Sequence, residues 1–309
     1  MPTIAALFPG QGSQSVGMSK EFFDNNDSAR ATLERAFAVL PGLETLMFEG
    51  PEDALKLTEN AQPALVASSI ACYRAWRART DARPSFAAGH SLGEFSALVA
   101  TKALEFDDAL RLVRARGHYM QAAVPVGEGA MSAVLKVSLE MIREVVSGIE
   151  GVEVANLNTP EQTVISGTTA AVAQANEILK TKGARVIPLQ VSAPFHSSLM
   201  QPARARLEKD LAVTEFFAMN FPVVANVTAL ENFNPLELPD LLARQVTSSV
   251  RWVESVQRLE ALGCDEFIEF GAGTALTGMI KRILPNAKTF NIGNPDDLEK
   301  YVSAHAQGE

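Results

Sequence analysis

The sequence predicts an α/β fold with a large core and a smaller inserted subdomain. Two observations lead to this prediction. The stretch Gly89-His90-Ser91-Leu92-Gly93 lies between a short apolar run and a helix-like segment, which is typical of a strand–turn–helix junction. Between residues 126 and 192 the elements read strand, helix, strand, strand, helix, strand, which is the pattern of a split βαβ unit. A chain of 309 residues, 47% of them hydrophobic, is long enough for both parts.

Short apolar runs bounded by turn formers predict strands, and apolar residues at intervals of three and four predict helices. In the first part of the core we expect strands at residues 3–8 and 84–88, with helices at residues 20–40, 53–57, 63–79, 91–100 and 107–122. After residue 192 we expect helices at residues 199–211, 236–245, 251–262 and 274–284, strands at residues 222–227, 267–270 and 288–292, and a tail without pattern after Asp296.

The inserted segment has its own pattern. We expect strands at residues 130–136, 152–157, 162–166 and 185–191, helices at residues 139–147 and 168–182, and a turn at Asn158-Thr159-Pro160. This order predicts a βαββαβ subdomain over residues 126–192. The core then consists of residues 1–125 and 193–309.

Composition limits the partners and the compartment. The net charge of −9 and the pI near 5.1 argue against nucleic acid as a partner, because a phosphate backbone requires a basic surface. Cys72 and Cys264 are too few for a disulfide framework and indicate a reducing compartment. We find no secretory signal, membrane span or metal-ligand spacing, and we expect a cytoplasmic protein without a bound metal or cofactor.

Ser91 is the candidate nucleophile. In a Gly-x-Ser-x-Gly turn the glycines allow a sharp bend that exposes the serine hydroxyl, and the next N–H, that of Leu92, is placed to stabilise an oxyanion. The loop Pro9–Gln14 after the first strand fits a second oxyanion donor. A dinucleotide-binding loop is the alternative, but its third glycine would fall at position 15, which is Ser15.

A serine nucleophile needs a base, and the chain has four histidines. His90 is adjacent to Ser91, and neighbouring side chains in a sharp turn point apart. His118 lies on a helix near Arg116, and His305 lies in the tail. His196, in a loop far along the chain, is the remaining candidate.

The usual third member of such a triad is missing. Between Leu110 and His196 there is no aspartate, although a glutamate could still reach the site. A histidine without a carboxylate can still activate serine and is less suited to activating water, so the pattern favours a transferase over a hydrolase.

Arg116 stands apart from its neighbours on the same helix. Helical spacing puts Arg111 and Arg114 near one face, whereas Arg116 points elsewhere and needs a partner if it is buried.

Taken together in their order and spacing, several motifs make the chain resemble the malonyl-CoA:acyl carrier protein transacylases of type II fatty acid synthesis. The resemblance covers nearly the whole chain. The motifs are Phe8-Pro9-Gly10-Gln11-Gly12-Ser13-Gln14, Ala61-Gln62-Pro63-Ala64-Leu65, the Ser91 turn with Glu94, Arg116-Gly117, Asn158-Thr159-Pro160 with Gln162–Gly167, Pro194-Phe195-His196 and Arg244-Gln245.

The resemblance implies an α/β-hydrolase-like core with a parallel sheet and a ferredoxin-like insert. It implies that Ser91 is acylated by malonyl-CoA, that His196 is its base, and that the backbone carbonyl of Gln245 fixes His196. It further implies an oxyanion hole from the N–H groups of Gln11 and Leu92. Arg116 would bind the malonyl carboxylate, and His90 and Asn158 would line the site.

Phe195 resembles the bulky residue of malonyl-selective members, although packing alone would also explain it. The acidic acyl carrier protein is the implied partner, and Lys281 and Arg282 are candidates for its contact, although a solvated helix face explains them equally well. We expect a monomer.

Three alternatives remain open. A serine thioesterase or esterase would hydrolyse malonyl-CoA without an acceptor. A non-catalytic carrier-binding protein would keep the fold without turnover. An acyltransferase serving a polyketide synthase in trans would use the same chemistry with a different carrier.

Overall fold

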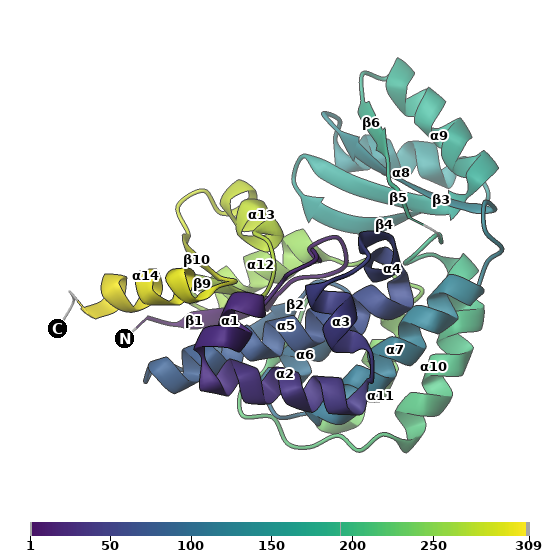
Figure 1. Ribbon diagram of the computed structural model, residues 1–309. Helices are drawn as coiled ribbons and strands as arrows, with labels where there is room; N and C mark the ends of the chain where they lie inside the picture. The colour runs from purple at the N-terminus through teal and green to yellow at the C-terminus, as the bar shows by residue number, and fades with distance from the viewer. Residues whose placement is uncertain (1, 192, 307–309) are drawn as a thin grey trace.

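The computed structural model describes residues 2–191 and 193–306 as an α/β fold with two separate sheets (Figure 1). Ser192, which ends the predicted insert, lies outside the described residues, as do Met1 and residues 307–309. The first sheet has the order β10-β9-β1-β2-β7-β8. Its strands are β1 (Ile4–Phe8), β2 (Pro84–Gly89), β7 (Val223–Val224), β8 (Glu231–Asn232), β9 (Glu266–Phe270) and β10 (Lys288–Ile292). All neighbouring strands are parallel except the pair β7 and β8.

The second sheet is antiparallel and has the order β4-β5-β3-β6. Its strands are β3 (Gly129–Leu135), β4 (Val152–Thr159), β5 (Gln162–Thr168) and β6 (Arg185–Pro188). Helices α8 (Leu139–Ser147) and α9 (Thr169–Thr181) complete the segment, and their apolar residues pack against this sheet. Figure 1 shows this part standing above the larger one.

Helices cover both faces of the parallel sheet. In β1, Ile4, Ala6 and Phe8 face a large cluster with α5, whereas Ala5 and Leu7 face a second cluster with α12 and α13. This alternation is the period of two expected for a strand that is buried on both faces. The helices are α1 (Lys20–Asn25), α2 (Asp27–Val39), α3 (Leu43–Phe48), α4 (Glu52–Lys56), α5 (Thr58–Arg79), α6 (Gly93–Ala100), α7 (Phe106–Ala122), α10 (Gln201–Val213), α11 (Leu238–Gln245), α12 (Trp252–Ala261), α13 (Ala275–Ile283) and α14 (Pro295–Ala306).

Most predicted elements are present with shifted ends, but some predictions were wrong. The expected helix at residues 20–40 is two helices, because Asn26 ends α1 and caps α2 by accepting a hydrogen bond from the Ala29 N–H at 2.9 Å. Helix α5 starts at Thr58, five residues before the predicted start, and runs through the buried Pro63. Asn158 and Thr159 belong to β4 rather than to a turn.

The tail after Asp296 is the clearest error, because it forms helix α14. Asn294 accepts a hydrogen bond from the Asp297 N–H at 2.9 Å, which is a helix N-terminal cap, and Leu298 and Tyr301 bury the apolar face. His305 therefore lies on a helix, with Nε2 2.9 Å from a Glu266 carboxylate oxygen.

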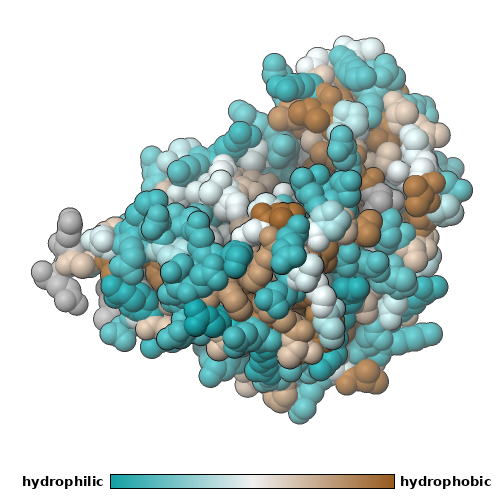
Figure 2. All heavy atoms as spheres, viewed as in Figure 1, coloured by the Kyte–Doolittle hydropathy of each residue, from teal (hydrophilic) through white to brown (hydrophobic). Residues whose placement is uncertain are grey.

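Polar residues cover most of the face drawn in Figure 2, with small brown patches between them. No helix in the described residues is long and apolar enough to cross a membrane.

The junction between β2 and α6 requires both of its glycines. A Cβ on Gly89 would lie 1.9 Å from the carbonyl of Gly93, and a Cβ on Gly93 would lie 2.1 Å from the Phe8 carbonyl oxygen. At both positions the neighbouring backbone is therefore so close that only glycine fits. Ser91 between them has φ +52°, in the left-handed region.

We predict that Gly93→Ala lowers the free energy of unfolding by about 3 kcal/mol, because the clash is with backbone that cannot rotate away. Gly278→Ala is the matched control. Gly278 is exposed on α13 with open space around it, and alanine there should raise the free energy of unfolding by about 1 kcal/mol. Urea unfolding of both variants measures the difference, and a Gly93→Ala protein as stable as the wild type would contradict the close-approach argument.

Candidate active site

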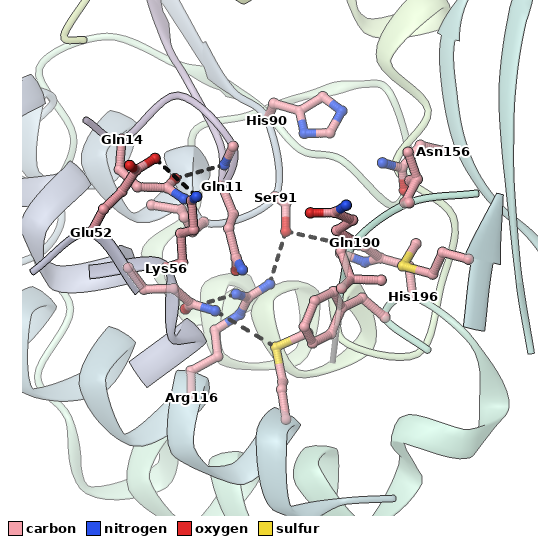
Figure 3. Close-up of a pocket in the computed structure, with 18 residues that line it drawn as sticks. Gln11, Gln14, Glu52, Lys56, His90, Ser91, Arg116, Asn156, Gln190 and His196 are labelled. Carbon is pink, nitrogen blue, oxygen red and sulfur yellow. Dashed lines mark hydrogen bonds and ion pairs between the residues drawn. The ribbon is translucent and has the colours of Figure 1, made fainter. Parts of the chain in front are cut away.

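Ser91 is anchored by its own backbone. Its N–H donates to Asn226 Oδ1 at 2.7 Å, and Asn226 Nδ2 donates to the Gly89 carbonyl at 2.7 Å. Asn226 thus holds both sides of the turn while Ser91 keeps its left-handed conformation. The side chain is left to face the cavity, as Figure 3 shows.

His196 lies beside the Ser91 hydroxyl, as the sequence predicts. Its Nε2 is 2.8 Å from Ser91 Oγ, and its Nδ1 is 2.9 Å from the backbone carbonyl oxygen of Gln245. Because a carbonyl only accepts hydrogen bonds, Nδ1 carries the proton and Nε2 is left to accept the serine proton. The arrangement is a serine–histidine pair in which a carbonyl takes the place of the carboxylate.

The surroundings of His196 oppose a positive charge. The ring is buried, and burial together with the nearby Arg116 charge lowers its pKa to about 3. The imidazole is therefore neutral, and able to accept a proton, across the neutral and mildly acidic range.

Arg116 brings a cation into the same place. The residue is 1% exposed, and its Nη2 donates to Ser91 Oγ at 3.1 Å and to Gln245 Oε1 at 2.9 Å. Its Nη1 donates to Gln62 Oε1 at 2.9 Å, and the guanidinium lies 5.7 Å from the centre of the Phe95 ring. Burial lowers its pKa to about 10, so the charge persists at neutral pH.

No carboxylate lies within ion-pair distance of Arg116 in the described part of the chain. Its Nε is buried without a hydrogen-bond partner. A buried cation with a free donor is suited to an anionic ligand that supplies the missing acceptor.

A cavity of about 450 Å³ joins these groups. Its walls come from both parts of the fold: Ser91 and Arg116 belong to the turn after β2 and to α7, whereas Met131 and Asn156 belong to β3 and β4. Phe195, 8% exposed, packs against the core and also lines the cavity. The full lining is Gln11, Gly12, Gln14, Glu52, Lys56, Gln62, His90, Ser91, Leu92, Arg116, Met120, Met131, Asn156, Leu189, Gln190, Val191, Phe195 and His196.

Gln11 and Leu92 line the cavity next to Ser91, and Figure 3 shows Gln11 beside it. Within the described residues, neither backbone N–H donates a hydrogen bond to another group. Both donors are therefore available to an oxygen atom in the cavity. The side chain of Gln11 donates to Thr58 Oγ1 at 3.3 Å.

Among the predicted site residues, Asn158 is placed differently from the expectation. Asn158 does not line the cavity; its Oδ1 lies 2.9 Å from Nε2 of His90, which does line it, and Asn156 takes the lining position. Side chains alternate along β4, but register irregularities after Val154 and Leu157 shift which residues face the cavity. Lys281 and Arg282 are exposed on α13 and are not part of the lining.

Sequence reasoning missed the polar residues that support the site. Gln62 binds Arg116, Asn226 holds the turn, and Glu94 is a buried carboxylate whose pKa burial raises to about 7. Gln62 and Glu94 stand within motifs already singled out, which is a usable signal. Asn226 follows a short strand and had no signal of its own.

The chain matches the family described as acyl transferase domain over residues 6–291. It is 44% identical over 305 residues to the malonyl CoA-acyl carrier protein transacylase of Bacillus subtilis, covering 97% of this chain and 96% of that protein. The protein of the same name from Escherichia coli K12 is 40% identical over 303 residues, covering 96% and 98% of the two chains.

Two solved structures are also similar to this chain over nearly its full length. An acyl-carrier-protein S-malonyltransferase from Burkholderia pseudomallei has a TM-score of 0.94 at 44% identity, covering 97% of this chain and 99% of that one. A malonyl-transacylase solved in complex with a type II PKS acyl-carrier protein has a TM-score of 0.95 at 38% identity, with the same coverage.

We predict that His196 contributes no inflection near pH 6.5, where an ordinary histidine titrates, to the acylation of Ser91 by p-nitrophenyl acetate. Because the pKa of His196 is lowered to about 3, the neutral base persists as the pH falls from 8 to about 5. The burst rate of nitrophenolate release measures this. Repeating it in Glu94→Gln removes the carboxyl that titrates near pH 7, so an inflection near 6.5 that survives there would contradict the neutral, buried histidine.

Proposed function

The chain belongs to the acyl transferase family, and on that basis we propose that it transfers a malonyl group from malonyl-CoA to the phosphopantetheine thiol of acyl carrier protein, supplying fatty acid synthesis. One observation carries this assignment to malonyl. The buried Arg116 guanidinium reaches the Ser91 hydroxyl itself, at 3.1 Å, so an acyl group on Ser91 has a cation beside it. A malonyl group ends in a carboxylate and supplies the matching charge.

The first half-reaction acylates the enzyme. Ser91 Oγ attacks the thioester carbonyl carbon as its proton passes to His196 Nε2. The N–H groups of Gln11 and Leu92 stabilise the tetrahedral oxyanion. The C–S bond then breaks, the proton on His196 passes to the departing coenzyme A sulfur, and malonyl-Ser91 ester remains.

The second half-reaction runs the same steps in reverse with another thiol. The carrier's phosphopantetheine thiol gives its proton to His196 and attacks the ester carbonyl, and the proton returns to Ser91 Oγ as the ester bond breaks. Because both intermediates place the oxyanion in one position, the same two N–H donors serve both steps. The Gln245 carbonyl keeps the Nδ1 proton of His196 in place throughout.

Neighbouring residues set the shape of the site. Phe195 fills the cavity wall next to His196 and limits branching on the acyl chain. His90, held by Asn158 of β4, lines the cavity and contributes to substrate binding. Exposed Lys281 and Arg282 offer an acidic carrier a basic contact.

The proposed family role also implies a fold for each of the two parts of the chain. The parallel part, residues 1–125 and 193–309, is an α/β-hydrolase-like core, and residues 126–192 form a ferredoxin-like subdomain. The order β3-α8-β4-β5-α9-β6 and the strand order β4-β5-β3-β6 support the second assignment. The enzyme acts as a monomer, since one chain supplies every group of the site, and in the cytoplasm, where buried Cys72 and Cys264 stay reduced.

A second carrier fits the same chemistry. The similar transacylase solved with a type II PKS acyl-carrier protein favours transfer to a polyketide carrier as the second candidate.

Intact-mass spectrometry tests the reaction. Incubation with malonyl-CoA should add one malonyl group to the wild type. Adding holo acyl carrier protein should then remove this group from the enzyme and place it on the carrier. Ser91→Ala should gain no adduct. Malonate released at the same rate without a carrier would instead indicate a thioesterase, and a wild type that never gains the adduct would overturn the proposal.

We predict that Arg116→Ala lowers kcat/KM for malonyl-CoA by about thirtyfold or more, because breaking a buried charge pair costs about 2–5 kcal/mol. Transfer of an acetyl group, which has no carboxylate, should fall far less. Arg114→Ala, on the same helix but outside the cavity lining, is the matched control and should leave both rates unchanged. An equal loss for malonyl and acetyl in Arg116→Ala would count against the carboxylate role.

A further inference from the structure

Glu94 is a buried acid without a part in the reaction described above. It lies in the first turn of α6, three positions after Ser91, and is 2% exposed. It does not line the cavity and therefore does not touch a substrate there. A buried carboxylate needs compensating partners, and these partners indicate what it does.

Both partners of Glu94 belong to the supports of the active site. Its Oε2 accepts a hydrogen bond from Gln245 Nε2 at 2.8 Å and another from the Asn226 N–H at 3.1 Å. Asn226 in turn holds the Ser91 N–H through its side chain. One carboxylate oxygen of Glu94 therefore links Asn226, which holds the Ser91 backbone, to Gln245.

The side-chain amide of Gln245 joins this carboxylate to the cation. Its Nε2 donates to Glu94 and to the Ser91 carbonyl at 2.9 Å, and its Oε1 accepts from Arg116 Nη2 at 2.9 Å. A flipped amide would turn its oxygen toward the carboxylate and its N–H groups toward the guanidinium. Both contacts would be repulsive, so Glu94 fixes the direction in which the amide points.

The amide also keeps the two charges apart. Glu94 forms no ion pair with Arg116 among the described residues. Burial lowers the pKa of Arg116, and the negative charge of Glu94, on the other side of the amide, partly opposes this lowering. A direct ion pair would occupy the donors that a ligand carboxylate needs. With Gln245 between them, Arg116 has a fixed acceptor for one Nη2 proton and keeps its Nε without a protein partner.

From these contacts we infer that Glu94 is a positioning residue for acyl-group selection: its carboxylate orients Gln245, and Gln245 orients the Arg116 guanidinium toward the acyl group on Ser91. The inference rests on the proposed malonyl transfer. Because this role depends on hydrogen-bond geometry, the length of the Glu94 side chain matters more than its charge.

Two variants separate length from charge. Glu94→Gln keeps an acceptor at the same reach and removes the charge, whereas Glu94→Asp keeps the charge and withdraws the acceptor by one methylene. Both substitutions keep a polar side chain at position 94, so both variants should fold. The matched controls are Glu269→Gln and Glu269→Asp. Glu269 is equally buried and accepts hydrogen bonds from the Leu276 and Thr277 N–H groups, but it lies outside the cavity lining.

The readout is the ratio of kcat/KM for malonyl-CoA to that for acetyl-CoA, with the active fraction taken from the first-turnover adduct. We expect Glu94→Gln to keep the malonyl value within about threefold, and Glu94→Asp to lower it by about tenfold or more while acetyl falls by less than about threefold, as expected for a lost hydrogen bond to a charged group. Both Glu269 variants should keep the wild-type ratio, because a loss of folded protein changes both substrates equally.

A Glu94→Asp enzyme with the wild-type ratio would overturn the inference, as would a Glu94→Gln enzyme that is impaired as much as Glu94→Asp. A wild type that forms no malonyl adduct would instead overturn the proposed function, so the two failures are distinguishable.

Discussion

Arg116 carries a positive charge into the interior, where an unpaired cation is unfavourable by several kcal/mol. The surrounding chain meets this cost with neutral acceptors: Gln62 and Gln245 amide oxygens, the Ser91 hydroxyl and the face of Phe95. These groups hold the guanidinium without neutralising it. Under the proposed function, the acyl group itself supplies the missing negative charge, which makes the resting site selective before any substrate arrives.

The same cation explains why the histidine needs no carboxylate. A negative group beside His196 would strengthen the base, yet it would also attract Arg116 away from Ser91. A backbone carbonyl orients the imidazole and adds no net charge. Glu94, a buried carboxylate near the site, lies behind the Gln245 amide. Under the proposed function His196 is a weak base, which suits exchange between two thiols that are good leaving groups better than attack by water.

Sequence reasoning predicted Ser91 and His196, which the structure places 2.8 Å apart, from signals in the chain itself. Ser91 stands between glycines that backbone contact demands, and His196 was found by eliminating the other histidines. It failed where placement depends on distant packing. Asn226 follows a strand of two residues, and only the fold brings it to Ser91. Irregular register in β4 places Asn156 rather than Asn158 in the cavity lining. Helix α14 was missed although Asn294 and Pro295 are ordinary start signals, because its apolar positions are few.

Under the proposed function, Arg116 exchanges its contact with the Ser91 hydroxyl for the carboxylate of the bound acyl group, while Gln245 still holds the guanidinium. A crystal structure of the wild-type malonyl-Ser91 intermediate, formed with malonyl-CoA and cooled without an acceptor thiol, measures this directly. We predict the malonyl carboxylate within hydrogen-bond distance of the guanidinium in a bidentate pair, with Gln245 Oε1 still in contact with Nη2. A malonyl carboxylate that points to solvent, with Arg116 unchanged, would contradict the account.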